Sequence, residues 1–501
     1  MSYREFVDAQ KHNNPCLAGL SNFLCESDSD RRSCRILKLD FTPNDGIRPD
    51  FQYVEPEDLH KNIYPISEKG RRRILIIEDL RCDIIETLGA AYNIDPVFFA
   101  SHLHAPFRQM NNQTPNLALL PSRQRKQNFV NFQYHRAVEL KGNVENETKL
   151  TRDMNVDRKV AVLLPTEDTR IALVQHSCSA ILFPEGGEGW LCLTLVDSPI
   201  FNKSLHVRYN TVLDEDQGVT KRGSQISSRL FLNGYEDFLP PSSVPLEIKG
   251  AYSGFRLSRE SLLDDLQYYW ERELPVMFDP AKPTLFALSF YPLKIIAAEW
   301  NNYMAAMSYH LKRHEYAVEA FNRRVMELDK LDAELRSLQA WRRRSLASQQ
   351  KLASVKHFVN LHAPRLQDYP YNLSGGDARG VQDDYNYLAL TLDDLSRRLK
   401  NMLPVVTSLV QISDSRRSLS ESRNVNRLTS LAIVFAPLSF TTGLFSMDTL
   451  NGPGGAPFWV VFAVAIPITV IVFLFARPPR WVTRFGSTRA RMAHKGHQMQ
   501  V

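Results

Sequence analysis

"LTSLAIVFAPLSFTTGLF" (residues 428–445) and "FWVVFAVAIPITVIVFLFA" (residues 458–476) are two apolar runs without a charged residue. As helices that rise 1.5 Å per residue, each would span roughly 27–29 Å, close to the hydrocarbon thickness of a bilayer. Two buried core helices are the alternative, but adjacent uncharged runs of this length are hard to bury in a chain with 23% charged residues. The two runs therefore predict two C-terminal transmembrane helices.

The basic residues around these runs predict their orientation. Arg423 and Arg427 precede the first run, a basic tail at 477–501 follows the second, and the connecting loop at 446–457 has no Lys or Arg. Because basic residues concentrate in cytosolic loops, both termini are expected in the cytosol and the loop outside. The tail follows a span directly, so we expect it to contact anionic lipid rather than RNA. The N-terminus lacks an import or secretion signal, which makes the plasma membrane the expected location.

The N-terminal half predicts an α+β cytosolic domain. We expect a variable, polar and irregular region at 1–70, then an α/β domain at 71–280. Apolar strands at 71–80, 159–165, 169–184 and 189–198 predict a largely antiparallel sheet. Residues 105–157, rich in Asn, Gln and Arg, are expected to be an insertion with little core. The six cysteines form no C-x-x-C pair and no zinc spacing, and are expected to be reduced thiols.

Residues 285–427 predict a stalk of long helices. Apolar residues recur three and four apart over 321–341, and a heptad seam follows from Leu388 to Leu409. Pro404 lies within this seam and should bend the helix or mark a junction. Since a lone helix would leave such a seam exposed, we expect it to be covered by other copies of the chain in an oligomer.

The order of these parts, and two sequence segments, resemble the CorA-type magnesium transporters. "LTSLAIVFAPLSFTTGLFSM" is similar to the family's first span and its exit, and "RRRILIIEDLRCDIIETLGAAYNIDPVFFASHL" to a segment of fungal members. The resemblance implies a homopentameric funnel in the membrane whose first span lines a pore. Mg²⁺ or another divalent cation would be the transported ion, with no organic cofactor and no nucleic-acid partner.

The resemblance also assigns roles to residues of the first span. The family's outer-mouth motif, Tyr-Gly-Met-Asn, falls on Phe445, Ser446, Met447 and Asp448, so only the methionine is retained. Asp448 becomes the candidate metal ligand at the mouth. The pore-facing positions fall on Val425, Leu428, Ala436 and Ser439, of which Leu428 and Val425 are expected to form a hydrophobic gate.

Other candidate sites are weaker. The stalk acids Asp393, Asp394 and Asp414, with the neighbouring pair Asp383 and Asp384, could hold regulatory cations or simply face solvent. His310 and His314 lie one helical turn apart but lack a third ligand, so we interpret them as ordinary stalk histidines. "NLSGGDARG" at 372–380 is expected to be a loop. No nucleophile and base arrangement stands out, and we do not expect an enzyme.

Two functions remain open at this point. The first is a divalent-cation transporter or channel that conducts along an axis lined by the first span. The alternative is a non-conducting membrane scaffold or regulatory subunit, which the altered mouth motif favours because Mg²⁺ sheds its water reluctantly and suits neutral oxygen ligands.

Overall fold

The computed structural model of the chain describes residues 2–25, 34–41, 48–63, 71–103, 127–141, 149–152, 154–164, 170–185, 189–200, 205–208, 222–239, 260–323, 328–363, 374–445 and 458–476. The chain divides into two compact units. Unit 1 consists of Met1–Met326 and Asp332–Pro404, and unit 2 of Glu327–Leu331 and Val405–Val501. Each unit is described by itself.

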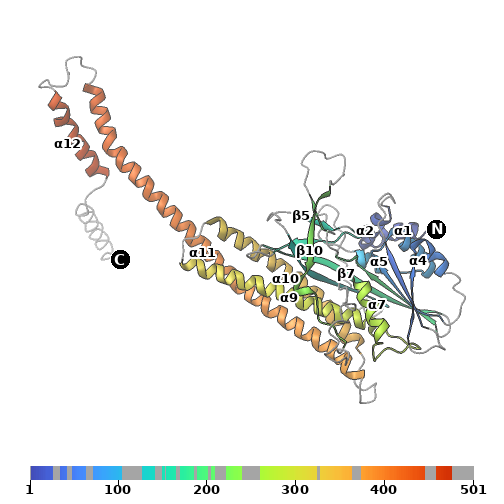
Figure 1. Ribbon diagram of the computed structural model, residues 1–501. Helices are drawn as coiled ribbons and strands as arrows, with labels where there is room; N and C mark the ends of the chain where they lie inside the picture. The colour runs from blue at the N-terminus through green and yellow to red at the C-terminus, as the bar shows by residue number, and fades with distance from the viewer. Residues whose placement is uncertain are drawn as a thin grey trace, which may run out of the picture. The chain divides into compact units, whose positions relative to one another are not determined.

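Unit 1 is built on one mixed sheet of ten strands (Figure 1). The strands are β1 (Arg35–Asp40), β2 (Asp50–Val54), β3 (Arg72–Glu78), β4 (Phe129–Lys141), β5 (Lys149–Arg152), β6 (Val160–Val162), β7 (Arg170–Glu185), β8 (Gly189–Val196), β9 (Leu205–Arg208) and β10 (Arg222–Leu230). Their order is β2-β1-β3-β8-β7-β4-β10-β9-β5, and β6 pairs with β7. Among the described pairs only β3 and β8 run parallel, so the largely antiparallel sheet is confirmed.

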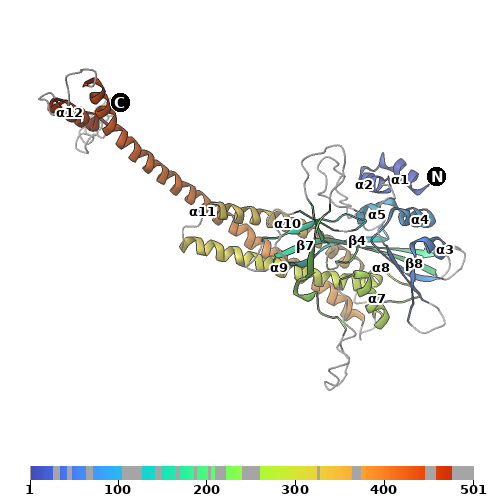
Figure 2. The same cartoon turned by 45° about the horizontal axis from the view of Figure 1, so that its top comes forward.

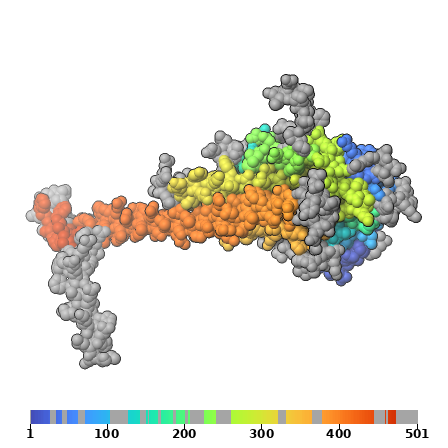
Figure 3. All heavy atoms as spheres, turned by 90° about the horizontal axis from the view of Figure 1, so that it is seen from below, coloured from blue at the N-terminus to red at the C-terminus, as the bar shows by residue number. Residues whose placement is uncertain are grey.

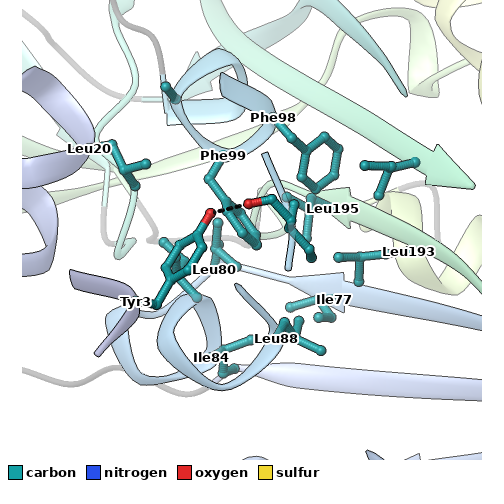
Figure 4. Packing of buried hydrophobic residues seen from close by; sticks show 14 of the residues in the cluster. Tyr3, Leu20, Ile77, Leu80, Ile84, Leu88, Phe98, Phe99, Leu193 and Leu195 are labelled. Atoms are coloured by element: carbon teal, nitrogen blue, oxygen red, sulfur yellow. Dashed lines mark hydrogen bonds between the residues drawn. The ribbon is translucent and has the colours of Figure 1, made fainter. Parts of the chain in front are cut away.

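One face of the sheet is covered by the N-terminal helices. These are α1 (Tyr3–Lys11), α2 (Ala18–Cys25), α4 (Cys82–Tyr92) and α5 (Pro96–Leu103). Figure 4 shows their side chains meeting Ile77 of β3 and Leu195 of β8 in one apolar cluster. The first 70 residues, expected to be polar and irregular, therefore contribute to the core, and that expectation is wrong for the described part.

The start of the chain is fixed firmly in this cluster. The Ser2 hydroxyl accepts from the Glu5 amide while the Glu5 side chain accepts from the Ser2 amide, a capping box that begins α1. The Tyr3 hydroxyl donates to the Ile94 carbonyl at 2.8 Å. A Cβ added to Gly89 would lie 2.5 Å from the Tyr3 ring, so only glycine allows α4 to approach this closely.

The segment 105–157, expected to hold little core, contains the central strand β4. β4 pairs with β7 without interruption from Phe129 to Leu140, and Phe132 and Tyr134 are fully buried. The polar residues of this segment suggested a surface position, and the strand was therefore not predicted. In the structure, polar side chains of β4 point toward packed helices rather than toward solvent. Arg136, for example, lies 3.0 Å from Glu299 of α9 with both side chains buried.

Further short elements complete unit 1. They are α3 (Leu59–Ile63), α7 (Leu262–Arg272), α8 (Leu285–Leu288) and 3₁₀ turns at Pro15–Leu17, Pro56–Asp58 and Phe231–Asn233. The thiol groups of the six cysteines are all unbridged, as expected.

Long helices follow: α9 (Phe290–Arg323), α10 (Leu328–His362) and α11 (Ser374–Phe445). Within unit 1, α9, α10 and the first part of α11 lie side by side (Figures 1 and 2). The Tyr385 hydroxyl of α11 donates to the Leu293 carbonyl of α9 at 2.9 Å. Figure 3 shows the side chains of α11, in orange, packed against the yellow helices. Because α11 begins at Ser374, the loop expected at 372–380 is helical over its described residues.

The heptad seam of α11 is buried inside a single chain. Leu388, Leu392, Leu395 and Leu399 are each at most 6% exposed. The expectation that other copies of the chain must cover this seam is therefore wrong up to Pro404, because the chain's own helices cover it. The junction expected at Pro404 is confirmed, since unit 1 ends at this residue.

Unit 2 holds the rest of α11 and α12 (Phe458–Ala476). Thr441 of α11 and Ala465 of α12 are buried, whereas most other described side chains of these helices are exposed. No helix in the described part of the chain combines the length and the apolarity needed to cross a membrane.

Candidate ion pathway on helix α11

The residues assigned to a pore lie in the second half of α11. Val425 is 60% and Leu428 66% exposed, and Ala436 and Ser439 are exposed as well. Phe445 is the last residue of the helix. The other mouth residues, Ser446, Met447 and Asp448, lie outside the described residues.

Helical geometry places most of these residues on one face of α11. At 3.6 residues per turn, each residue advances about 100° around the axis. Val425, Ala436 and Ser439 then fall within about 40° of one line along the helix, and Leu428 falls about 60° from it. The same line collects further small or polar residues: Thr407, Gln411, Asp414, Ser418, Glu421, Ala432 and Gly443. We call this set, with Val425, Leu428, Ala436 and Ser439, the narrow face of α11.

Charge is divided between the two sides of the same helix. The narrow face carries two carboxylates, Asp414 and Glu421, and no arginine. Arg416, Arg423 and Arg427 lie about 160–180° away, on the opposite face. A cation that travels along the narrow face would therefore meet carboxylate and hydroxyl oxygens before small apolar residues. It would avoid the guanidinium groups of Arg416, Arg423 and Arg427, but not that of Arg417, which pairs with Glu421.

The contacts of this stretch are local and weak. Glu421 pairs with Arg417 at 3.1 Å, but both side chains are about two-thirds exposed. Exposed pairs of this kind stabilise a helix by about 0.3–0.5 kcal/mol at most. The Thr441 and Thr442 hydroxyls donate to carbonyls one turn earlier. The exposed pair with Arg417 is therefore too weak to keep the Glu421 carboxylate from binding a cation.

Two of the other acidic candidates, Asp393 and Asp394, are paired with basic neighbours. Asp393 accepts from Arg397 at 3.1 Å and Asp394 from Arg398 at 2.9 Å, each one turn away on an exposed face. Asp414 is exposed. Across the described ranges, no three His, Cys, Asp or Glu side chains are arranged to hold a metal ion. Asp393, Asp394 and Asp414 thus remain candidates that are spread along α11 rather than gathered into one site.

His310 and His314 are buried between α9 and α10. His314 contacts the Glu334 carboxylate through Nδ1, and its Nε2 lies 3.2 Å from the Ser337 hydroxyl. Burial lowers the pKa of His310 to about 3, so it is neutral at physiological pH. Glu334 lies on the next helix along the chain, where spacing within "HLKRHE" could not reveal it. Both histidines pack within the helical hairpin, in agreement with their interpretation as ordinary stalk residues.

Sequence reasoning from single motifs missed the polar half of the narrow face. Thr407, Gln411, Ser418 and Glu421 belong to no motif, and each is unremarkable alone. Their common signal is a helical period that continues through 405–443, which becomes readable once the helix is known to run unbroken from Ser374 to Phe445.

Comparisons with known proteins found one matching family model and several similar solved structures. Residues 258–477 match the family model described as CorA-like Mg²⁺ transporter protein. Among solved structures, the chain is similar to the CorA magnesium transporter from Methanocaldococcus jannaschii, at 13% identity and a TM-score of 0.36, covering 90% of this chain and 99% of that one. It is also similar to the full-length CmaX protein, at 13% identity and a TM-score of 0.38, covering 91% and 100%. No curated protein matches the sequence.

The matched segment begins just before α7 and ends just after α12, so it contains the whole of the helical part and the narrow face of α11. The family is one of transporters and not of enzymes. Residues 258–477 of this chain are therefore similar to the CorA-like Mg²⁺ transporter family.

Proposed function

We propose that this protein conducts divalent cations across a membrane along the narrow face of α11. The division of charge on α11 is the observation that carries the proposal. Asp414 and Glu421 share the narrow face with Val425, Ala436 and Ser439, while Arg416, Arg423 and Arg427 lie opposite. In uniform solvent this division of charge has no effect on the helix. In a helix that lines a cation path, the carboxylates attract the cation on one face and the arginines stay away from it on the other.

The proposal requires several copies around an axis, because one helix cannot enclose an ion. We propose five, with 428–445 and 458–476 as membrane spans, both termini in the cytosol and the plasma membrane as the location. Their uncharged composition and the basic flanks support this topology. The exposure of Val425 and Leu428 in a single chain also supports it, since apolar side chains of this size need cover from lipid or from other copies.

In this arrangement each part of the path has a distinct role. A ring of Asp448 at the mouth would attract a hydrated divalent cation. Ser439 and Ala436 leave room for the ion and its water, since their side chains are short. Leu428 and Val425 form the constriction, where an apolar ring can close the path by excluding water. Glu421 and Asp414 then attract the ion on the cytosolic side.

The altered mouth motif favours a second candidate function, a non-conducting membrane scaffold. Where the family has glycine and asparagine, this chain has Ser446 and Asp448. A carboxylate ring binds a divalent cation more strongly than a ring of neutral amides, and strong binding slows release. If release is slow enough, the assembly holds an ion at its mouth without passing it on.

Ion flux into liposomes distinguishes the two functions. The purified full-length chain is reconstituted, and entry of Mg²⁺, Co²⁺ and Ni²⁺ is followed with an enclosed fluorescent indicator. We expect flux that stops after Leu428→Arg, which puts five guanidinium groups at the constriction, and persists after Val434→Arg on the opposite face if the variant still assembles. An intact assembly without flux of any of the three ions would leave the scaffold function.

The mouth is tested separately. Ser446→Gly with Asp448→Asn restores the family motif, and we expect faster Mg²⁺ entry than in the wild type because a neutral ring releases the hydrated ion more readily. Equal rates in the two proteins would show that the mouth does not limit conduction. A scaffold that becomes conducting only in the double variant would assign the loss of transport to these two positions.

A further inference from the structure

The stretch of α11 that leads into the first apolar run has few contacts to hold its helical form. Residues 413–427 read SDSRRSLSESRNVNR, and the five serines and two asparagines among them are weaker helix formers than alanine or leucine. Every side chain from 414 to 429 is exposed. Helical segments with few buried contacts open locally at a low cost in free energy. Another protein can therefore bind this stretch as an extended peptide.

Within this stretch, Ser420 has the surroundings of a kinase substrate. Its hydroxyl makes no hydrogen bond among the described residues, whereas the Thr429 and Ser430 hydroxyls donate to carbonyls one turn earlier. Arg417 precedes Ser420 by three residues and Arg416 by four. Kinases distinguish substrates by their charge pattern, and carboxylates in the peptide groove of basophilic kinases pair with arginines on the N-terminal side of the serine. The sequence before Ser420 therefore suits a kinase of this class.

Arg417 lies between Ser420 and Glu421 on the surface of the helix. It precedes Glu421 by four residues, so its guanidinium is within reach of both side chains. At about 100° per residue, Arg417 lies about 60° from Ser420 and about 40° from Glu421 around the helix axis. In the structure the guanidinium pairs with the Glu421 carboxylate at 3.1 Å. Ser420 itself lies about 140° from the centre line of the narrow face.

A phosphate on Ser420 would compete with Glu421 for this arginine. At pH 7 a phosphoserine carries a charge of about −1.5 to −2 and three acceptor oxygens, against the single charge of a carboxylate. A guanidinium can donate two parallel hydrogen bonds to it, and the pair with Glu421 is weak because both side chains are about two-thirds exposed. Arg416 lies about 40° from Ser420 around the axis and brings a second guanidinium to the same phosphate.

We propose that Ser420 is phosphorylated by a basophilic serine kinase and that the phosphate takes the Arg417 guanidinium away from Glu421. ATP supplies the phosphoryl group. The bond between its γ-phosphorus and the oxygen that bridges to the β-phosphorus breaks, and a bond from the γ-phosphorus to Ser420 Oγ forms. ADP leaves, and the hydroxyl proton passes to the base of the kinase. The Glu421 carboxylate is then free on the narrow face. Access to cytosolic ATP and the use of Glu421 by a cation rest on the proposed function and its topology.

Phosphorylation of the purified full-length protein in detergent tests the site directly. The protein is incubated with ATP, Mg²⁺ and the catalytic subunit of protein kinase A, which is a basophilic kinase. Mass spectrometry of the peptides then locates the phosphate. We expect the phosphate of the 413–427 stretch on Ser420. Absence of phosphate from Ser420 would overturn the proposal.

Variants show whether the arginines direct the kinase to this serine. Arg417→Gln should slow phosphorylation of Ser420 at least about tenfold, since the kinase loses a hydrogen bond between charged groups. Ser422→Ala is the matched control, because Ser422 is exposed on the same stretch but has Leu419 and Ser418 where Ser420 has its arginines. Ser420 should be phosphorylated in this variant at the wild-type rate. Equal rates in Arg417→Gln and the wild type would contradict the proposal.

Labelling of carboxylates measures the release of Glu421 without any need for ion flux. The protein is treated with a water-soluble carbodiimide and an amine, and the labelled residues are quantified by mass spectrometry. Phosphorylation should raise the labelling rate of Glu421 by about twofold, which is the change expected when a weak exposed pair is lost. Asp393, which pairs with Arg397 in the same way, is the internal control and should not change. Arg417→Gln should show the same rise without the kinase. An unchanged rate at Glu421 after phosphorylation would contradict the exchange of Arg417.

Flux into liposomes then relates the site to the ion path. The phosphorylated wild type should admit Mg²⁺ faster than the unphosphorylated protein, because the narrow face gains a free carboxylate. Kinase treatment should not change the flux of Ser420→Ala. Raised labelling of Glu421 without flux in either state would support the site and contradict the proposed conduction. Equal flux in the two states of a conducting protein would contradict a role of the phosphate in the ion path.

Discussion

The two halves of α11 belong to one helix but have opposite surroundings. In the half before Pro404, Leu392 and Leu399 are fully buried by the chain's own helices. In the half after it, Leu419 is 62% and Leu431 55% exposed. The comparison shows that the chain's own helices cover the first half, whereas the described residues leave apolar side chains of the second half exposed.

The largest effect should come from breaking the first half. Leu392→Ala removes a fully buried side chain and should lower the free energy of unfolding by about 2–5 kcal/mol. Leu419→Ala makes the same change at an exposed position of the second half and should cost less than about 0.5 kcal/mol. Denaturant unfolding of the full chain, followed through the buried Trp300 and Trp341, measures both. Equal losses would mean that Leu419 is covered as tightly as Leu392.

Acid should destabilise the helices of unit 1 but not the second half of α11. Burial lowers the pKa of His310 from 6.5 to about 3, so the folded state resists a proton that the unfolded chain accepts. The free energy of unfolding is therefore at its full value above pH 6.5, as far as His310 is concerned. It decreases as the pH falls toward 3, by up to about 1.4 kcal/mol per pH unit. The second half of α11 has no histidine.

Hydrogen exchange measured at pH 7 and at pH 5 can resolve this difference by region. Amides of α9 and α10 should lose protection at pH 5 once exchange rates are corrected for pH, and those of 405–443 should not. His310→Leu should flatten the pH dependence of the unfolding free energy. If the slope stays the same in His310→Leu, then another buried histidine such as His176, whose pKa burial also lowers, carries the effect.

A smaller effect is expected at the junction itself. Pro404 supplies no amide hydrogen to α11, which removes one helical hydrogen bond where unit 1 ends. Pro404→Ala should restore that bond and slow amide exchange around 401–408 by an amount equivalent to about 1–3 kcal/mol. Faster exchange in the variant would show that the ring of Pro404 itself packs and holds the junction.

The smallest change in stability should come from Glu421→Gln, because its pair with Arg417 is exposed and stabilises the helix by no more than about 0.5 kcal/mol. Divalent-cation flux into liposomes should nevertheless fall, since the narrow face loses a carboxylate. Arg423→Gln, on the opposite face, is the control and should leave flux unchanged. A fall in both variants would point to net charge rather than to the narrow face.

Much of the architecture could be predicted from periodicity. The alternation of strands at 169–184 and 189–198 and the heptad spacing from Leu388 onward state how each segment presents its apolar side. They do not state what covers that side. The seam of α11 therefore suggested an oligomer, although α9 and α10 cover its first half. A heptad pattern has the same appearance whether its partner comes from the same chain or another.

The sites divide in the same way. Positions on a single helix, such as Val425 and Ser439, can be placed from their spacing alone. The contact of His314 with Glu334 cannot, because the two residues lie on different helices and meet only through helix packing. β4 was missed for a related reason, since its buried Arg136 and half-buried His135 look like surface residues until their partners on α7 and α9 are known.

The capping box at Ser2 has a practical consequence for work with this chain. The Ser2 amide donates to Glu5, and the next residue, Tyr3, reaches across to Ile94. An epitope or reporter joined rigidly to Ser2 would compete with these bonds and disturb the packing of α1 on Gly89. Reporters that map which side of a membrane each end occupies are better attached through a flexible Gly-Ser linker, or to the basic tail, so that a misfolded first helix is not mistaken for an altered topology.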